Sequence, residues 1–263
     1  MTVIQAIVLG AVQGITEFLP VSSSGHLVLL QRLLKIDEPP LLFDTMVHVG
    51  TLGAVVIVLW EEVLALLKKP WQKQTLLLVI ATLPTVGAAL LFNDVIEAAF
   101  RGGALLGPAF LFTAVALTVA ELLPIRAGAP PEKRPREKMN LLDAVVIGVC
   151  QSVAILPAVS RSGLTLSGSL LRNIDREDAA RFSFLLSIPA ILGALVLQLA
   201  GFSDGVSETG GLSLAVGTLT AFLSGLLAIR LMLKIVREKR LFGFAAYTAV
   251  LGILCIVLGK HLG

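Results

Sequence analysis

The chain has 263 residues and a formal net charge of +3, and 56% of its residues are hydrophobic while only 15% are charged. With a mean hydropathy of +0.91 it is far more apolar than soluble domains, which are about half apolar and a quarter charged, so a soluble globular domain is excluded. Most of the chain falls into apolar runs long enough for a helix to cross a bilayer, whereas an outer-membrane barrel would show short alternating segments. The sequence therefore predicts an all-α integral membrane protein.

The first predicted element, residues 2–34, holds about ten apolar residues, then proline, serines and glycine, then about ten more, so neither arm is long enough to cross. Residues 141–172 repeat this pattern. We interpret both as re-entrant helix-loop-helix hairpins, because irregular backbone at membrane depth needs protein or a wet cavity around it. A single kinked spanning helix in each place is the alternative.

Three apolar runs follow each hairpin and predict three transmembrane helices per half of the chain. They cover residues 44–60, 75–92 and 104–123, and then 182–200, 212–233 and 241–259. Between the halves, the charged and Pro-rich segment RAGAPPEKRPREKMN predicts a solvated linker. We therefore divide a single membrane domain, residues 1–263, into repeat one (1–125), the linker (126–140) and repeat two (141–263).

The two hairpins are versions of each other. QGITEFLPVSSSGH (residues 13–26) follows AIVLGAVQ, which ends at its first residue, and QSVAILPAVSRSG (151–163) likewise follows AVVIGVCQ. Because each half has an odd number of spans, the second copy must insert upside down relative to the first. The sequence thus predicts an inverted-topology repeat whose polar hairpin tips meet near the middle of the membrane.

Basic residues are distributed unevenly between the two faces that this topology creates. The face with both termini holds only Arg32, Lys35, Arg101 and Lys260, against fifteen lysines and arginines on the opposite face. Cytoplasmic loops carry an excess of such residues, so we expect the basic face in the cytoplasm and both termini outside. The topology also accounts for the net charge, so no nucleic-acid partner is expected.

Ionisable residues within the predicted hairpins are the first candidates for function. Gln13 and Glu17 are four residues apart and share a helix face. Glu17 would be costly in an apolar run without a partner, and Arg161 in the other hairpin tip is the obvious one. A buried ion pair that only fixes the two repeats together is the structural alternative.

Serines begin the second arm of each hairpin. They are Ser22, Ser23 and Ser24 in the first and Ser160 and Ser162 in the second. Serine caps helices well, but a cap needs only one per helix. Two helix N-termini, several hydroxyls and the guanidinium of Arg161 together predict a polyanion site, and phosphate is the obvious ligand.

Three further side chains belong to this prediction or lie near it. His26, in the first turn after the serines, is placed to act as general base, general acid or nucleophile, although a lone histidine is usually structural. Thr165, one turn beyond Arg161, adds a hydrogen bond to an anion. For Asp44 and His48, near the start of the first full span, we expect an interfacial or supporting role and not a catalytic one.

The same segments resemble those of the bacterial undecaprenyl-pyrophosphate phosphatases, a family linked to bacitracin resistance. QGITE fits that family's Glu-or-Gln-x-x-x-Glu motif, SSSGH its Ser/His segment, and PAVSRSGLT its PGxSRSxxT motif except at Ala158, where the pattern has Gly. This departure bears on the backbone geometry of the turn. The similarity extends over nearly the whole chain, including FDTMVHVGTLGAV and the SFLLSIPAILGA region.

The resemblance implies an enzyme that removes the terminal phosphate of undecaprenyl pyrophosphate, and so regenerates the lipid carrier of peptidoglycan synthesis in the bacterial plasma membrane. It implies that Glu17 with Gln13 organises the site and a divalent cation, Mg²⁺ or Ca²⁺. Ser23 and His26 are its candidates for nucleophile and proton transfer, and attack by a water remains open. Arg161 would hold the pyrophosphate with the help of Ser160, Ser162 and Thr165. We expect Gln13, Ser22 and Ser24 to bind the pyrophosphate as well.

Other functions are compatible with parts of this pattern. Inverted repeats with broken helices are typical of transporters, so a carrier or lipid flippase with a midplane anion site is the main alternative. A type 2 phosphatidic acid phosphatase is disfavoured, because Ser167 stands where its histidine is expected and no lysine precedes Ser24. Gly-rich spans such as GTLTAFLSG can pack helix on helix, which leaves a homodimer open.

Overall fold

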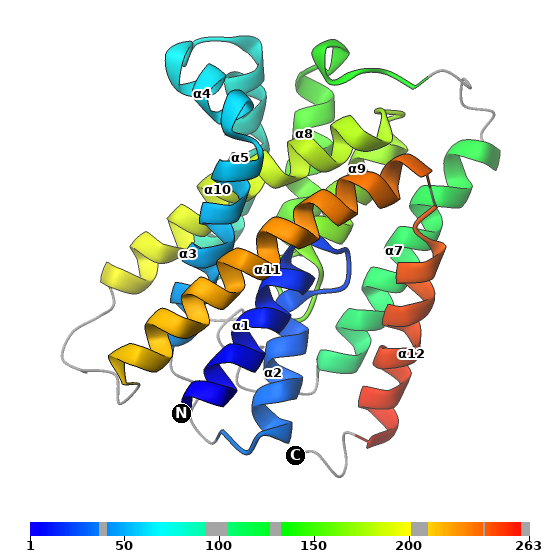
Figure 1. Cartoon of the computed structure of the whole chain (residues 1–263). Coiled ribbons are helices and arrows are strands. Elements are labelled where there is room, and N and C mark those ends of the chain that lie inside the picture. Colours follow the sequence, from blue (N-terminus) through cyan, green and yellow to red (C-terminus); the bar gives the residue numbers. More distant parts are fainter. Residues whose placement is uncertain (37–40, 93–104, 127–132, 201–209, 239, 259–263) are drawn as a thin grey trace.

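The computed structural model of the chain describes residues 1–36, 41–92, 105–126, 133–200, 210–238 and 240–258, and in these ranges it is built from helices (Figure 1). The α-helices are α1 (Val3–Phe18), α2 (Ser23–Leu33), α3 (Leu41–Val58), α4 (Trp60–Lys68), α5 (Lys73–Leu91), α7 (Leu106–Arg126), α8 (Leu141–Val153), α9 (Arg161–Leu171), α10 (Arg176–Ala200), α11 (Gly211–Glu238) and α12 (Phe242–Leu258). The predicted all-α class is confirmed.

By length and composition, four helices in the described part of the chain can cross a membrane, namely α5, α7, α10 and α11. A fifth candidate is the pair α3 and α4, which is bent by 84° at Leu59. Each of the six predicted spans coincides with a helix, although α12 is shorter than the others, with 17 residues. The chain is thus a multi-pass membrane protein.

Two helical hairpins occupy the centre of the molecule, as predicted. In hairpin one (α1 and α2), the Gln5 Nε2 at the start of α1 donates to the Leu34 carbonyl oxygen just after α2 at 3.5 Å. In hairpin two (α8 and α9), Arg172 after α9 donates from Nε to Asp143 near the start of α8 at 2.7 Å. A single kinked spanning helix would separate these ends, so that alternative does not fit. How deeply the hairpins enter a bilayer stays a prediction.

Ion pairs stabilise the base of hairpin two, where α8 begins and α9 ends. Asp143 is fully buried, and Arg134 donates to the same oxygen as Arg172, at 2.9 Å. Arg134 belongs to the predicted linker. An isolated parallel β-bridge pairs the backbone of Arg134 with that of Ile174, just before α10. The second half of the linker is therefore packed on the protein, with Met139 fully buried, while residues 127–132 lie outside the described ranges.

Equivalent glycines in the two hairpins allow close helix packing. A Cβ on Gly10 of α1 would lie 2.3 Å from the backbone oxygen of Gly217 in α11, and a Cβ on Gly148 of α8 would lie 2.5 Å from that of Ala81 in α5. Gly10 and Gly148 occupy matching places in the duplicated sequence. The contacts α1–α11 and α8–α5 are therefore alike at these two glycines. The opposite insertion of the two halves remains a prediction.

Candidate active site

An ion pair joins the tips of the two hairpins. Glu17 lies in the last turn of α1, and Arg161 is the first residue of α9. Nη2 of Arg161 donates to Oε1 of Glu17 at 2.6 Å, and their side chains are 16% and 5% exposed. The two residues that the sequence singled out as partners are thus in contact, although 144 positions separate them.

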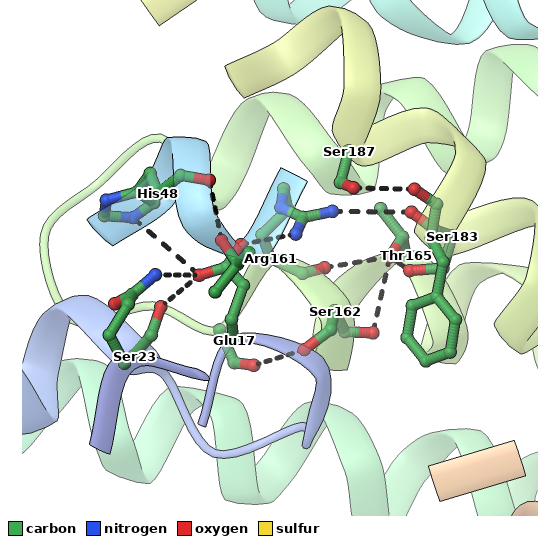
Figure 2. Close-up of polar contacts among 12 residues, drawn as sticks. Glu17, Ser23, His48, Arg161, Ser162, Thr165, Ser183 and Ser187 are labelled. Carbon is green, nitrogen blue, oxygen red and sulfur yellow. Dashed lines mark hydrogen bonds and ion pairs between the residues drawn. The ribbon is translucent and has the colours of Figure 1, made fainter. Parts of the chain in front are cut away.

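Glu17 is the centre of the polar cluster in Figure 2, with three more side chains around its second carboxylate oxygen. Ser23 donates from Oγ to Oε2 at 2.5 Å, and Gln13 donates from Nε2 to the same atom at 3.0 Å. Nε2 of His48, on α3, lies 3.7 Å from it. The carboxylate therefore has a hydroxyl, an amide and an imidazole within reach in addition to the guanidinium.

Hydrogen bonds from hairpin two and α10 hold the other side of the cluster. Arg161 donates from Nη1 to the Ser183 carbonyl oxygen at 3.4 Å, and the hydroxyls of Ser183 and Thr165 are 2.5 Å apart. Ser162 donates from Oγ to the Leu19 carbonyl oxygen in tip one at 3.0 Å. These bonds orient the guanidinium and connect the tips, so the position of Arg161 does not depend on Glu17 alone.

The tight turns at the hairpin tips place two helix N-termini beside the ion pair. Ser22 Oγ accepts from the Gly25 backbone N–H at 3.2 Å, and Ser160 Oγ accepts from that of Gly163 at 3.1 Å, so each caps its helix. Ser22 and Ala158 have φ values of 72° and 64°, which lie in the left-handed region that glycine adopts without steric cost. Ala158 thus adopts a backbone conformation that favours glycine, which is the residue that the PGxSRSxxT motif has at this position.

A cavity of about 530 Å³ opens onto this cluster. Seven of the predicted site residues line it: Glu17, Ser22, Ser23, Ser24, Ser160, Arg161 and Ser162. Gln13 is fully buried behind Glu17, and Thr165 is fully buried with its hydroxyl on Ser183 and on backbone oxygens of its own helix. These two residues therefore support the site from outside the cavity.

His26 does not line the cavity. Its Nδ1 donates to the Ser22 carbonyl oxygen at 2.6 Å, and its Nε2 lies 2.7 Å from the hydroxyl of Tyr247 in α12. The ring packs edge-on against Phe110 and stacks on Tyr247, at centroid distances of 5.5 and 5.7 Å. Both ring nitrogens are engaged, so this histidine supports the serine turn from behind.

Asp44 and His48 do line the cavity, together with Gln31. Nδ1 of His48 donates to the Asp44 carbonyl oxygen at 2.6 Å, which leaves Nε2 on the side of Glu17, and Gln31 donates to Asp44 Oδ1 at 2.9 Å. Our sequence-based view of this pair as interfacial or supporting did not place them in the cavity, where His48 lies near Glu17. Their spacing of four residues in an apolar run was the available signal.

Oxygen donors suited to a cation meet beside Glu17. Oε1 of Gln13 is buried and has no hydrogen-bond partner among the described residues. A partnerless amide oxygen next to a carboxylate fits Mg²⁺ or Ca²⁺, which prefer oxygen ligands. The described part of the chain has no group of three or more His, Cys, Asp or Glu side chains suited to a metal. Glu17 would therefore hold such an ion from the cavity wall, with Gln13 buried behind the carboxylate.

The ion pair makes a prediction about stability. Replacing Arg161 by Met should lower the free energy of unfolding by about 3 kcal/mol or more, because Glu17 is left charged and unpaired in a buried place. The double variant Glu17→Gln/Arg161→Met should recover most of this loss, because no buried charge remains. Thermal and denaturant unfolding in detergent measure both. Equal instability of the single and double variants would show that the pair itself is not the cause.

Comparison with known proteins shows the family of the chain. The family model described as bacitracin resistance protein BacA matches residues 6–254. Proteins named undecaprenyl-diphosphatase from Carboxydothermus hydrogenoformans and Halothermothrix orenii are 48% and 39% identical, and undecaprenyl-diphosphatase 4 from Bacillus thuringiensis subsp. konkukian is 44% identical. Each of these matches covers 98% of both chains. The chain belongs to the bacitracin resistance protein BacA family.

Proposed function

We propose that this protein is a membrane hydrolase that removes the terminal phosphate of undecaprenyl pyrophosphate and releases undecaprenyl phosphate, the lipid carrier of cell-wall synthesis. One observation carries the proposal: a serine hydroxyl donates to a carboxylate whose other oxygen binds an arginine, at the meeting of two helix N-termini. The substrate is inferred from the names of the relatives. These names also favour a diphosphatase over the transporter or lipid flippase that the repeat alone suggested.

The geometry supports Ser23 as the nucleophile. Its hydroxyl already donates to Glu17, so the carboxylate can accept the proton as Ser23 Oγ bonds to the terminal phosphorus. The bond between that phosphorus and the bridging oxygen breaks, and undecaprenyl phosphate leaves. Water then attacks the phosphoserine, inorganic phosphate departs, and the serine recovers its proton.

Phosphoryl transfer is accelerated mainly by neutralising charge on the phosphate oxygens and by aligning the nucleophile. Arg161 and the N-termini of α2 and α9 face the cavity and suit this task. A divalent cation, held by Glu17 with Gln13 behind the carboxylate, would add further positive charge. Its binding is part of the proposal.

The two histidines are assigned different tasks. His26 contacts Ser22 and not the cavity, so we assign it the positioning of the Ser22–Ser23 turn. His48 is the imidazole within reach of Glu17, and it can exchange a proton with that carboxylate during the second half of the reaction.

The main test is phosphate release from a polyprenyl pyrophosphate by the purified protein in detergent. We expect release by the wild type, loss with a chelator, and recovery with Mg²⁺ or Ca²⁺. Arg161→Ala should reduce kcat by about a hundredfold or more, because one stabilising charge is missing. Lys69→Ala, on an exposed residue after α4, is the matched control and should leave the rate unchanged. A wild type that binds the lipid without releasing phosphate would favour the carrier.

Covalent trapping tests the role of Ser23. Quenched single turnovers with substrate labelled at the terminal phosphate should give a phosphorylated protein, with the label on the peptide that contains Ser23. Ser23→Ala should abolish the label, whereas Ser24→Ala, next along the same cavity wall, should retain it. Turnover without a labelled protein at any quench time would favour direct attack by water.

We further propose that the protein lies in the bacterial plasma membrane with both termini and the mouth of the cavity on the outer face. The start of α1 and the end of α12 lie at one end of the molecule in Figure 1, opposite α4 and the base of hairpin two. That opposite end carries Arg134, Arg136 and Arg172, which suits the cytoplasmic side.

Cysteine labelling in whole cells tests this orientation. In a background with Cys150 and Cys255 replaced by serine, Ser24→Cys should react with a membrane-impermeant maleimide added outside, because Ser24 lines the cavity. Lys69→Cys should react only after the cells are opened. Labelling of Ser24→Cys confined to opened cells, with normal labelling of an external marker, would reverse the proposed orientation.

A further inference from the structure

The cavity beside Glu17 has two chemically different walls. Side chains from α1, α2, α3 and α9 make one wall mostly polar and charged, with Leu27 and Val28 of α2 as apolar members. The other wall is apolar and comes from one segment of α10 and from tip two. Its members are Ala154, Ile155, Leu156, Ala190, Ile191, Ala194 and Leu195. The cavity is therefore amphipathic, like a lipid pyrophosphate.

The α10 part of this wall is a single helix face. Ala190 and Ala194 are four residues apart, as are Ile191 and Leu195, so all four side chains point to the same side. Ile191 is only 7% exposed, whereas Ala194 is exposed to the surface. The apolar wall thus runs from the interior of the protein outwards, and the cavity meets the surface near Ala194.

The size of the cavity limits what it can hold. At about 530 Å³ it is in the usual range for sites that bury a drug-sized ligand, roughly 300 to 1,000 Å³. This is room for a pyrophosphate and a short piece of chain but not for a whole undecaprenyl group. With the pyrophosphate beside Arg161 and Ser23, the polar wall offers an isoprenoid only Leu27 and Val28 of α2 as apolar contacts, whereas the α10 face is apolar throughout.

We propose that the α10 face of Ala190, Ile191, Ala194 and Leu195 is the binding site for the first isoprenoid units of the substrate, next to the pyrophosphate. The rest of the chain leaves the cavity near Ala194 and lies in the lipid. This inference rests on the proposed function. It makes these four residues determinants of specificity for an isoprenoid pyrophosphate over a chain-free one, with little discrimination among chains longer than the wall.

A second apolar depression provides a competing place for the chain. It lies between α3 and α11, has a volume of about 460 Å³, and is lined by residues that include Met46, Gly50, Leu214 and Phe222. None of the residues that line it belongs to the polar cluster around Glu17. A chain that begins at a pyrophosphate held by Arg161 contacts the α10 face first, so we expect this second groove to stay without substrate contacts.

Photocrosslinking of the wild type locates the chain without any variant. A farnesyl pyrophosphate analogue with a diazirine on its first or second isoprenoid unit should label the peptide that contains residues 190–195 or the one that contains 154–156. Excess undecaprenyl pyrophosphate should suppress the labelling. Labelling confined to peptides of the α3–α11 groove, or labelling that excess substrate does not suppress, would overturn the proposal.

Kinetics with a chain-length series test the specificity. Ala194→Phe should lower kcat/KM for farnesyl and undecaprenyl pyrophosphate roughly tenfold, mainly through KM, and affect isopentenyl pyrophosphate less. Val196→Phe is the control, because Val196 is 63% exposed on the same helix and does not line the cavity. An equal loss for all substrates, or the same loss in Val196→Phe, would contradict the proposal. Absence of phosphate release from every substrate by the wild type would instead overturn the proposed function, whatever the photocrosslinking shows.

Discussion

The contact between Glu17 and Arg161 is the interaction on which the rest of the site depends. Each charge would be costly alone in this buried place, and each comes from a different hairpin, so neither tip is satisfied without the other. Their pairing brings together the serine turns, the capped helix N-termini and the cavity. A buried ion pair contributes little net stability against an apolar replacement, which is why its presence suggests chemistry as well as architecture.

The two hairpins have similar sequences but different side chains at the site. Gln13 and Gln151 occupy equivalent positions, and each has a buried amide oxygen without a hydrogen-bond partner among the described residues. At two positions, however, the match changes, since Ile155 stands at the position of Glu17 and Arg161 at that of Ser23. The duplication therefore supplies complementary parts of one site, with the carboxylate and hydroxyl from one copy and the guanidinium from the other.

Much of this arrangement follows from the sequence, because composition and apolar run lengths fix the helices and the cost of a buried charge predicts the pairing of Glu17 with Arg161. The positions of three other residues do not follow from local pattern. Asp44 and His48 lie near a predicted span end, where polar residues are ordinary, and only the tertiary packing of α3 brings them to the cavity and His48 within reach of Glu17. His26 is next to the serines in sequence, but its ring direction is set by side chains of α7 and α12.

Tyr247 is the only tyrosine of the chain, and its ring stacks on His26 directly behind the serine turn. The turn carries a strained residue, Ser22, whose carbonyl oxygen accepts from that same histidine. Fluorotyrosine incorporated into the protein would thus give a single fluorine resonance, from residue Tyr247. Tyr247 contacts His26, and His26 contacts Ser22, the neighbour of the proposed nucleophile Ser23. The molecule contains a spectroscopic reporter whose line shape would follow motion of the turn during turnover.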